Sequence, residues 1–151
     1  MDRQRGRATP SMSVEFCDTN IIVYAFDTTA GAKHERAKLL LERLWQEGVG
    51  ALSVQVLQEL FVTLTRKIAR PLNPLAARGI VADLATWKVV QPSAPDVLTA
   101  IDASVRWQVS FWDAMIITAA QRAGAVVVWS ENLSSGQGFD DVTVRNPFDV
   151  A

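Results

Sequence analysis

Three acidic residues stand in surroundings that do not suit an unpaired charge. Asp18 ends a short apolar run, Glu59 lies within an apolar helical pattern, and Asp113 is the single acid near the start of a strongly apolar helix. A buried carboxylate normally has a compensating partner, because leaving it unpaired is costly. If the three acids converge, their repulsion calls for a cation, and oxygen-only ligands suit a hard metal such as Mg²⁺ or Mn²⁺.

Each acid also has a structural explanation. Asp18 can simply cap the helix that follows it, as aspartate commonly does. Glu59 and Asp113 can instead pair with an arginine or lie exposed on a polar helix face. Arg66 and Arg106 are suitable arginine partners. The sequence leaves these alternatives open.

Other catalytic chemistry is disfavoured by the scarcity of two residue types. The chain has one histidine, His34, and one cysteine, Cys17. These are too few for the usual zinc cage, and too few for a Ser-His-Asp or Cys-His nucleophile. The chain also lacks the glycine-rich phosphate loops of nucleotide-binding proteins. We expect His34 to be an exposed helical residue, and Cys17 to be a free thiol in a reducing compartment.

The alternation of apolar patterns predicts the elements that position these acids. Short apolar runs predict strands, and amphipathic segments between them predict helices, so we expect a single α/β domain with a mainly parallel sheet. Asp18-Thr19-Asn20 and Ser130-Glu131-Asn132 each follow a strand directly. They therefore fall at the edge where open α/β sheets bind ligands. The expected strands are 14–17, 49–52, 88–90, 125–129 and 142–144, of which 125–129 has the pattern of a strand buried on both faces.

The helices are expected from the spacing of apolar residues and from their end signals. The pattern from 37 to 45 predicts a helix that ends at Gly48, and Ser53 is a suitable cap for the next helix. Further helices are expected at 75–87, at 95–107 and from 111 to about 120. The expected buried stripe of the helix that runs from Ser53 to about Ile68 is Val56, Leu57, Leu60, Phe61 and Leu64.

Length, composition and charge restrict the class of protein. The chain has 151 residues, 49% of them apolar, and a formal net charge of -1. These values suit one domain with a sizeable core, without a surface of overall positive charge. No apolar run approaches the ~18 residues of a membrane span, and the arginine-containing segment 1–13 lacks the apolar core of a secretion signal. We expect a flexible tail at 1–13, a globular domain at 14–151 and a cytoplasmic protein.

A basic cluster at one predicted helix end has two interpretations. Arg66, Lys67 and Arg70 follow the apolar stripe that contains Glu59. Cations at a helix C-terminus are favoured by the helix dipole, so the cluster can be a solvated helix end. It can equally contact a phosphate backbone, which makes these three residues candidates for RNA binding.

The motifs together resemble the PIN-domain family, and more narrowly the VapC-type ribonuclease toxins of bacterial toxin–antitoxin pairs. No single motif is specific, but the order and spacing of all of them match from about residue 14 to residue 148. The matching segments are Phe16-Cys17-Asp18-Thr19-Asn20, Ser53 to Phe61 with Thr65-Arg66-Lys67, Phe111-Trp112-Asp113-Ala114, Trp129 to Gln137, and Asn146-Pro147-Phe148.

This resemblance implies an endoribonuclease that depends on Mg²⁺ or Mn²⁺. Asp18, Glu59 and Asp113 would hold the metal, directly or through water. Metal-activated water would attack an RNA phosphodiester. The residues that would orient the carboxylates are Thr19, Asn20 and Ser130.

One position departs from the family pattern. The family often carries a fourth acid where this chain has Asn132, which follows Glu131. Asn132 can still offer a carbonyl oxygen to the site, and Glu131 is a candidate metal ligand in its place. The departure also supports an alternative function, a catalytically weakened RNA- or protein-binding module with the same fold. A phosphatase that uses Asp18 as nucleophile is a further alternative, but Asn20 stands where such enzymes commonly have a second acid.

The resemblance also implies partners. We expect an RNA substrate, a small antitoxin whose C-terminal segment crosses the active-site groove, and a homodimer. Four tryptophans either mark an interface or pack in the ordinary way at the core boundary. They are Trp45, Trp87, Trp107 and Trp112.

Overall fold

The computed structural model describes residues 13–149 and contains one six-stranded sheet. Its strand order is β3-β2-β1-β4-β6-β5, and all neighbouring strands are parallel except β5 and β6. The expectation of a mainly parallel α/β sheet is therefore confirmed. The strands are β1 (Glu15–Cys17), β2 (Gly50–Ser53), β3 (Lys88–Val90), β4 (Val127–Trp129), β5 (Gly138–Phe139) and β6 (Val142–Arg145).

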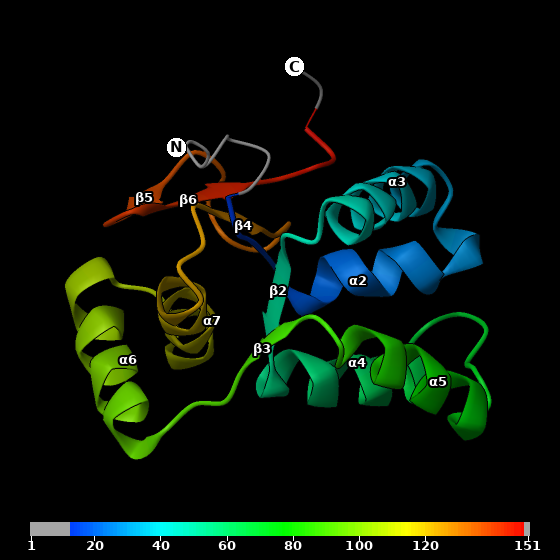
Figure 1. Ribbon diagram of the computed structural model, residues 1–151, viewed down its shortest axis with the longest axis horizontal. Coiled ribbons are helices and arrows are strands. Elements are labelled where there is room, and N and C mark those ends of the chain that lie inside the picture. Colours follow the sequence, from blue (N-terminus) through cyan, green and yellow to red (C-terminus); the bar gives the residue numbers. More distant parts are fainter. Residues whose placement is uncertain (1–12, 150–151) are drawn as a thin grey trace, which may run out of the picture.

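Helices cover both faces of this sheet, as Figure 1 shows. On one face, α7 packs against β2, β4 and β6, and α6 packs on α7. On the other face, α2 contacts α3 and α4, and α5 packs on α4. The helices are α2 (Thr19–Phe26), α3 (Ala32–Glu47), α4 (Val54–Arg66), α5 (Pro74–Leu84), α6 (Ala94–Trp107) and α7 (Phe111–Arg122), with a 3₁₀ turn, η2 (Thr28–Ala30), between α2 and α3.

Local sequence signals fix where the helices begin and end. Ser53 and Ser110 cap α4 and α7 by accepting backbone N–H bonds. Ser93 and Asp96 form a reciprocal capping box at the start of α6. Gly48 ends α3 with φ at 68°, a left-handed conformation that glycine adopts without a steric penalty. The expected cap at Ser53 and the expected stop at Gly48 are both confirmed.

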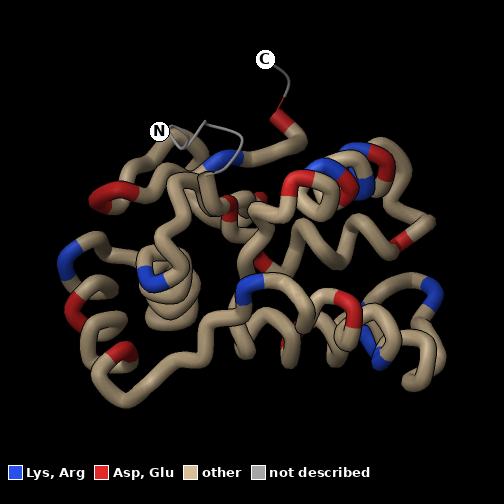
Figure 2. Tube along the Cα trace, in the orientation of Figure 1, with Lys and Arg blue, Asp and Glu red and all other residues tan. Residues whose placement is uncertain are grey.

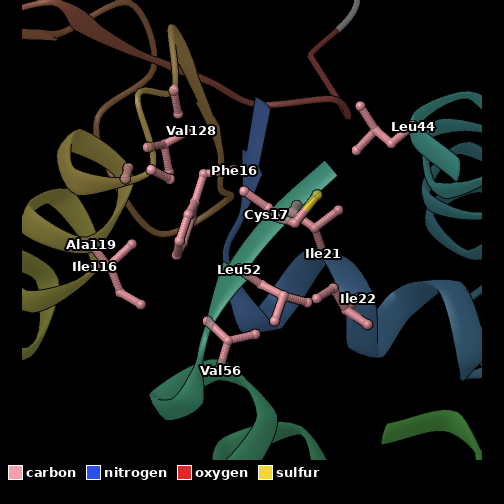
Figure 3. Close-up of a cluster of buried hydrophobic side chains, with 14 of the residues drawn as sticks. Phe16, Cys17, Ile21, Ile22, Leu44, Leu52, Val56, Ile116, Ala119 and Val128 are labelled. Atoms are coloured by element: carbon pink, nitrogen blue, oxygen red, sulfur yellow. The ribbon is translucent and has the colours of Figure 1, made fainter. Parts of the chain in front are cut away.

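The core forms on the two sides of β1 because successive strand residues point to opposite faces. Figure 3 shows Phe16 directed toward Ile116 and Ala119 of α7, with Cys17 directed toward Ile21 on the other side. Phe16, Cys17 and Ile21 are all fully buried. Full burial of each large apolar side chain stabilises the fold by roughly 1.5–3 kcal/mol. This packing fixes β1, and with it the position of the residues that follow the strand.

Several sequence expectations are corrected by the structure. Phe61 is 37% exposed and lies outside the buried stripe of α4, while Val126 is 44% exposed, so strand 125–129 is not buried on both faces. Trp87 lies beyond α5, which ends at Leu84. His34 is largely buried, and its Nδ1 lies 2.9 Å from the carbonyl oxygen of Tyr24.

The strand β5 was not expected from the sequence. It contains only Gly138 and Phe139, and it pairs antiparallel with β6. Two residues carry no periodicity, and a glycine weakens strand propensity. The buried ring of Phe139 packs edge-on against Trp107 at a centroid distance of 5.0 Å. Tertiary packing therefore forms this strand.

Charge is distributed unevenly over the helices. Figure 2 shows Lys, Arg, Asp and Glu interspersed along α3, whereas the tube of α2 is almost free of charged residues. This difference follows burial, because most of α2 is packed against neighbouring elements while α3 has an exposed outer face. Among residues 13–149, no helix is long and apolar enough to cross a membrane.

A buried acid at the start of β1, paired with Arg43, predicts a pH-dependent stability. Glu15 is 8% exposed, accepts from Arg43 at 2.7 and 3.1 Å, and accepts from Trp129 Nε1 at 2.8 Å. Burial opposes ionisation, but the hydrogen bonds from Arg43 and Trp129 hold the pKa of Glu15 below its ordinary value of 4.5. The folded protein thus binds this proton less readily than the unfolded chain, so the contribution to stability is complete above pH 4.5 and is lost as the pH falls through the folded pKa.

We therefore expect Glu15→Gln to lower the free energy of unfolding by about 2 kcal/mol at neutral pH. The difference from wild type should shrink as the pH falls below 4.5. Urea unfolding at several pH values measures both effects. Glu47→Gln is the control, because Glu47 contacts the same Arg43 at 3.2 Å from a more exposed position. An equal loss in both variants would contradict the role given to burial.

Candidate active site

A cavity of about 710 Å³ lies where the chain leaves β1. Asp18 follows β1 directly, Glu59 comes from the middle of α4, and Asp113 comes from the first turn of α7. The structure thus brings the three acids of the sequence analysis to one cavity. Half of the other predicted site residues line it too, namely Thr19, Asn20, Lys67 and Asn132, whereas Ser130, Glu131, Arg66 and Arg70 do not.

Asp18 caps α2, and its side chain is the most enclosed of the three acids. Its Oδ1 accepts from the backbone N–H of Thr19 at 2.7 Å. Its Oδ2 accepts from the Ser130 hydroxyl at 2.8 Å and from Asn20 Nδ2 at 3.3 Å. The residue is 7% exposed. The capping and site interpretations of Asp18 are therefore compatible, since one carboxylate both caps the helix and lines the cavity.

Thr19 links the first strand to α4. Its hydroxyl donates to Glu59 Oε1 at 2.7 Å, and Gln55, one helical turn before Glu59, donates to Oε2 at 3.3 Å. Glu59 is exposed to solvent, so it is not the buried acid that its apolar neighbours suggested. Two hydrogen bonds nevertheless hold its carboxylate beside Asp18.

The segment after β4 closes around Asp18. The Ser130 hydroxyl donates to Asp18 and accepts from the backbone N–H groups of Asn132 and Leu133 at 3.2 and 3.3 Å. Asn20 Oδ1 accepts from the backbone N–H of Glu131 at 3.0 Å. The amide of Asn20 and the hydroxyl of Ser130 therefore connect Asp18 to this segment, which places Asn132 on the cavity wall.

The electrostatics of the cavity favour a positively charged ligand. Burial raises the pKa of Asp18, and the charges of Glu59 and Asp113 raise it further, against the hydrogen bonds from Ser130 and Thr19. The arginine partners considered for the acids do not balance this charge. Arg106 lies 3.6 Å from Asp140 instead, and among residues 13–149 no ion pair involves Glu59 or Asp113. An added cation would relieve this repulsion.

The donor set fits a hard divalent cation by its chemistry. Asp18, Glu59 and Asp113 offer carboxylate oxygens, and Asn132 offers an amide oxygen at the same cavity. Within the described part of the chain, no group of three or more His, Cys, Asp or Glu residues lies close enough together to hold a metal ion directly. An ion at this cavity would therefore be contacted directly by only part of this set, with water completing its shell.

Glu131 does not join the other acids. Its carboxylate accepts from the Tyr24 hydroxyl at 2.8 Å and forms an ion pair with Lys33, and it is absent from the cavity wall. Burial opposes ionisation, but the hydrogen bonds from Lys33 and Tyr24 keep the pKa of Glu131 below its ordinary range. The Lys33 ammonium also lies 5.1 Å from the Tyr24 ring centroid and 5.4 Å from that of Phe148. Glu131, expected as a metal ligand, instead links the segment after β4 to Tyr24 of α2 and Lys33 of α3.

This placement predicts that Glu131→Gln leaves metal affinity within about twofold of wild type, because removal of a true ligand typically costs far more. The amide can still accept from Tyr24 but loses the ion pair with Lys33, whose side chain is 44% exposed, so the loss of stability should be below about 1 kcal/mol. Calorimetric titration with Mn²⁺ measures the affinity. Tenfold weaker Mn²⁺ binding by Glu131→Gln would show instead that Glu131 belongs to the metal site.

The basic cluster divides between the cavity and the surface. Lys67 lines the cavity, whereas Arg66 and Arg70 are exposed beyond it. Sequence reasoning also missed several lining or supporting residues. Gln55 could have been found from its spacing of four residues before Glu59, and Asp27 caps the turn after α2. No local pattern marks Tyr24 and Lys33, whose roles depend on their tertiary contacts with Glu131.

Comparisons with known proteins agree with this geometry. A sequence model described as the PIN domain matches residues 16–134, which is most of the chain. The chain belongs to the PIN domain family. A search of curated proteins finds no match to this PIN domain chain.

Solved structures share the fold of this PIN domain. A toxin–antitoxin complex from Klebsiella pneumoniae is 21% identical with a TM-score of 0.64, covering 91% of this chain and all of that one. The VapC20 toxin of Mycobacterium tuberculosis, named as cleaving the sarcin–ricin loop, is 26% identical with a TM-score of 0.60 over 85% of this chain and 98% of that chain. VapBC2 of Rickettsia felis, bound to a DNA fragment from its promoter, is 19% identical with a TM-score of 0.63, over 88% and 98%.

Proposed function

We propose that this PIN domain protein is a metal-dependent endoribonuclease and the toxin of a VapBC-type toxin–antitoxin pair. The observation that carries this proposal is the buried carboxylate of Asp18, which shares one cavity with Glu59 and Asp113 at the end of a parallel strand. The likeness to a toxin described as cleaving the sarcin–ricin loop supports RNA as the substrate.

The proposed cofactor is Mg²⁺ or Mn²⁺. Asp18, Glu59 and Asp113 would hold the cation, directly or through water, with Asn132 contributing its amide oxygen. When bound, such a cation lowers the pKa of water and offsets the negative charge that develops at a phosphodiester.

The residues around the acids would position them for this work. Thr19 fixes Glu59, and Ser130 and Asn20 fix one oxygen of Asp18, through the hydrogen bonds described above. Held this way, the carboxylates need little reorganisation when a phosphodiester enters, which is the condition for electrostatic stabilisation of a transition state. Lys67 on the cavity wall would bind a phosphate oxygen of the substrate, and Arg66 and Arg70 would attract the RNA from outside the cavity.

The surface beside the cavity is suited to the proposed antitoxin. An apolar groove of about 410 Å³ lies on α4 and α5 and includes Phe61 and Val81. Gln58 and Val62 line both this groove and the acidic cavity, so the two lie side by side. A peptide with apolar residues followed by a basic side chain would complement both parts. We also propose, from the family resemblance, a homodimer and a cytoplasmic location.

A second function rests on one position. Asn132 brings no charge to the place where the family often has a fourth acid, which favours a weakened module that binds RNA without cutting it efficiently. The phosphatase alternative is weaker, because the amide of Asn20 is engaged with Asp18 and the backbone of Glu131 and carries no acidic proton.

Incubation of the purified protein with a mixed pool of structured RNA, in Mg²⁺, Mn²⁺ or EDTA, tests the proposal. We expect cleavage that needs the divalent ion and that a co-expressed antitoxin suppresses. Binding of the pool without cleavage in either metal would favour the module. Transfer of labelled phosphate onto Asp18 would favour the phosphatase, since hydrolysis by activated water forms no phosphoenzyme.

A further inference from the structure

One tryptophan differs from the other four in its surroundings. Trp45 and Trp87 pack edge-on against each other at 5.4 Å, and the guanidinium groups of Arg106 and Arg145 lie over Trp107 and Trp129. Trp112 is 62% exposed, and within residues 13–149 no cation lies over its ring. Its aromatic contact in this part of the chain is with its neighbour Phe111. A ring face of Trp112 is therefore available to a partner.

The ring of Trp112 is anchored although it is exposed. Phe111 contacts it edge-on, with a centroid distance of 4.9 Å and an interplanar angle of 72°. Phe111 itself packs against the small cluster between α6 and α7 that contains Ala103 and Met115. Ser110 fixes the first turn of α7 by accepting the backbone N–H of Asp113 at 3.1 Å. A ring held in this way loses little conformational entropy when a ligand stacks on it.

The position of Trp112 connects it to the acidic cavity. It precedes Asp113 in the first turn of α7, and both side chains line the cavity together with Lys67. A phosphodiester held near Asp113 would bring its attached nucleosides within reach of the neighbouring ring. Exposed aromatic side chains beside a phosphate-binding surface are the usual means by which proteins hold unpaired bases.

We propose that Trp112 is a stacking platform for an unpaired nucleobase that flanks the scissile phosphate. This inference rests on the proposed ribonuclease function, and it adds the residue that would hold a base beside the cut. The observations favour a base over a peptide side chain, because the same cavity wall carries a lysine that suits a phosphate and acids that would hold the proposed cation beside it. A protein contact at Trp112 is an alternative that the test distinguishes.

The test combines a protein variant with a substrate variant. Trp112→Ala is compared with Trp112→Phe, which can still stack, and with Trp45→Ala, which removes an exposed tryptophan outside the cavity. The substrates are a short single-stranded RNA that the wild type cleaves and copies with one abasic nucleotide at each position beside the cut. We expect Trp112→Ala to raise KM about 5- to 100-fold with a smaller change in kcat, and Trp112→Phe to recover most of the loss.

The decisive result comes from assaying the Trp112→Ala variant on the abasic substrates. At one position, the abasic copy should raise the wild-type KM by a similar factor, and Trp112→Ala should then cost nothing more, because the base that it contacts is already gone. The proposal is overturned if the losses from Trp112→Ala and from the missing base multiply at every position. It is also overturned if Trp112→Ala behaves like Trp45→Ala. Normal RNA kinetics with weakened antitoxin binding would overturn it in favour of a protein contact.

A binding measurement separates this proposal from the proposed function. In EDTA, a mixed single-stranded RNA pool should quench the tryptophan fluorescence of the wild type more than that of Trp112→Phe. Quenching without cleavage in any metal would support stacking while refuting hydrolysis. Cleavage by the wild type together with equal quenching in both proteins would refute stacking while leaving hydrolysis intact. If the pool is neither bound nor cut, both proposals fail.

Discussion

Asp18→Asn and Asp113→Asn should each lower kcat/KM for RNA cleavage by about a thousandfold or more. Both side chains line the acidic cavity, and Asp18 is the one whose oxygens are fixed by Thr19, Asn20 and Ser130. Replacing either carboxylate with an amide removes the charge that would hold the cation while keeping the shape. Loss of a preorganised electrostatic contact of this kind costs 10²–10³ or more in rate.

The stability of these variants distinguishes a catalytic loss from an unfolded protein. Burial and the neighbouring acids raise the pKa of Asp18, so its charge is unfavourable in the folded protein without metal. Asp18→Asn should therefore melt no lower than wild type in EDTA, and it should lose the rise in Tm that Mg²⁺ gives the wild type. Asp102→Asn, on the exposed side of α6, is the matched control for activity. Full activity in Asp18→Asn would place the chemistry elsewhere.

Asn132→Asp should strengthen metal binding and weaken the stability of the metal-free protein. Asn132 lies on the cavity wall, and its backbone N–H is held by Ser130, so an aspartate there would face the same space as Asp18 and Asp113. The added charge should lower the Mn²⁺ concentration for half-maximal cleavage by about tenfold, since outer and inner ligands each change metal affinity by 10–100-fold. Without metal, the same charge should lower the Tm by a few degrees because it adds to the repulsion.

A metal titration of cleavage and a melting curve in EDTA measure these two effects. Asn132→Ser serves as the matched control, because it shortens the side chain without adding charge. An Asn132→Asp variant with unchanged metal dependence would show that this position lies outside the metal site. A large gain in kcat at saturating metal would instead support the interpretation that the natural asparagine weakens the enzyme.

The part of this site that lies at strand ends could be predicted from the sequence. Asp18, Thr19 and Asn20 follow a buried strand, and the ends of parallel strands meet at one edge, so their convergence with Ser130 follows from the pattern. The roles within the site remain predictions that the variants above test. The apolar setting of Glu59 was a less reliable guide, because an exposed acid in a helix can reach a neighbouring helix through one hydrogen bond from Thr19.

The individual side-chain partners of loop residues could not be predicted. Glu131 lies next to the site in sequence, but its partners Lys33 and Tyr24 are 98 and 107 residues away. The direction in which a loop carboxylate points depends on such distant partners. The spacing of apolar residues along the sequence does not identify them. For the same reason the two-residue strand β5 and the exposure of Phe61 appear only in the folded protein, where tertiary packing outweighs local propensity.

The chemical nature of the cut RNA ends shows whether activated water attacks the phosphodiester. If the acidic cavity directs activated water at phosphorus, the products carry one hydroxyl end and one phosphate end without a 2′,3′-cyclic phosphate. An RNA with a single 2′-deoxynucleotide at the cut should then still be cleaved by the wild type in Mn²⁺, and not by Asp18→Asn. Cyclic phosphate ends, together with resistance of the 2′-deoxy substrate, would show attack by the RNA's own 2′-hydroxyl and would contradict the proposed site chemistry.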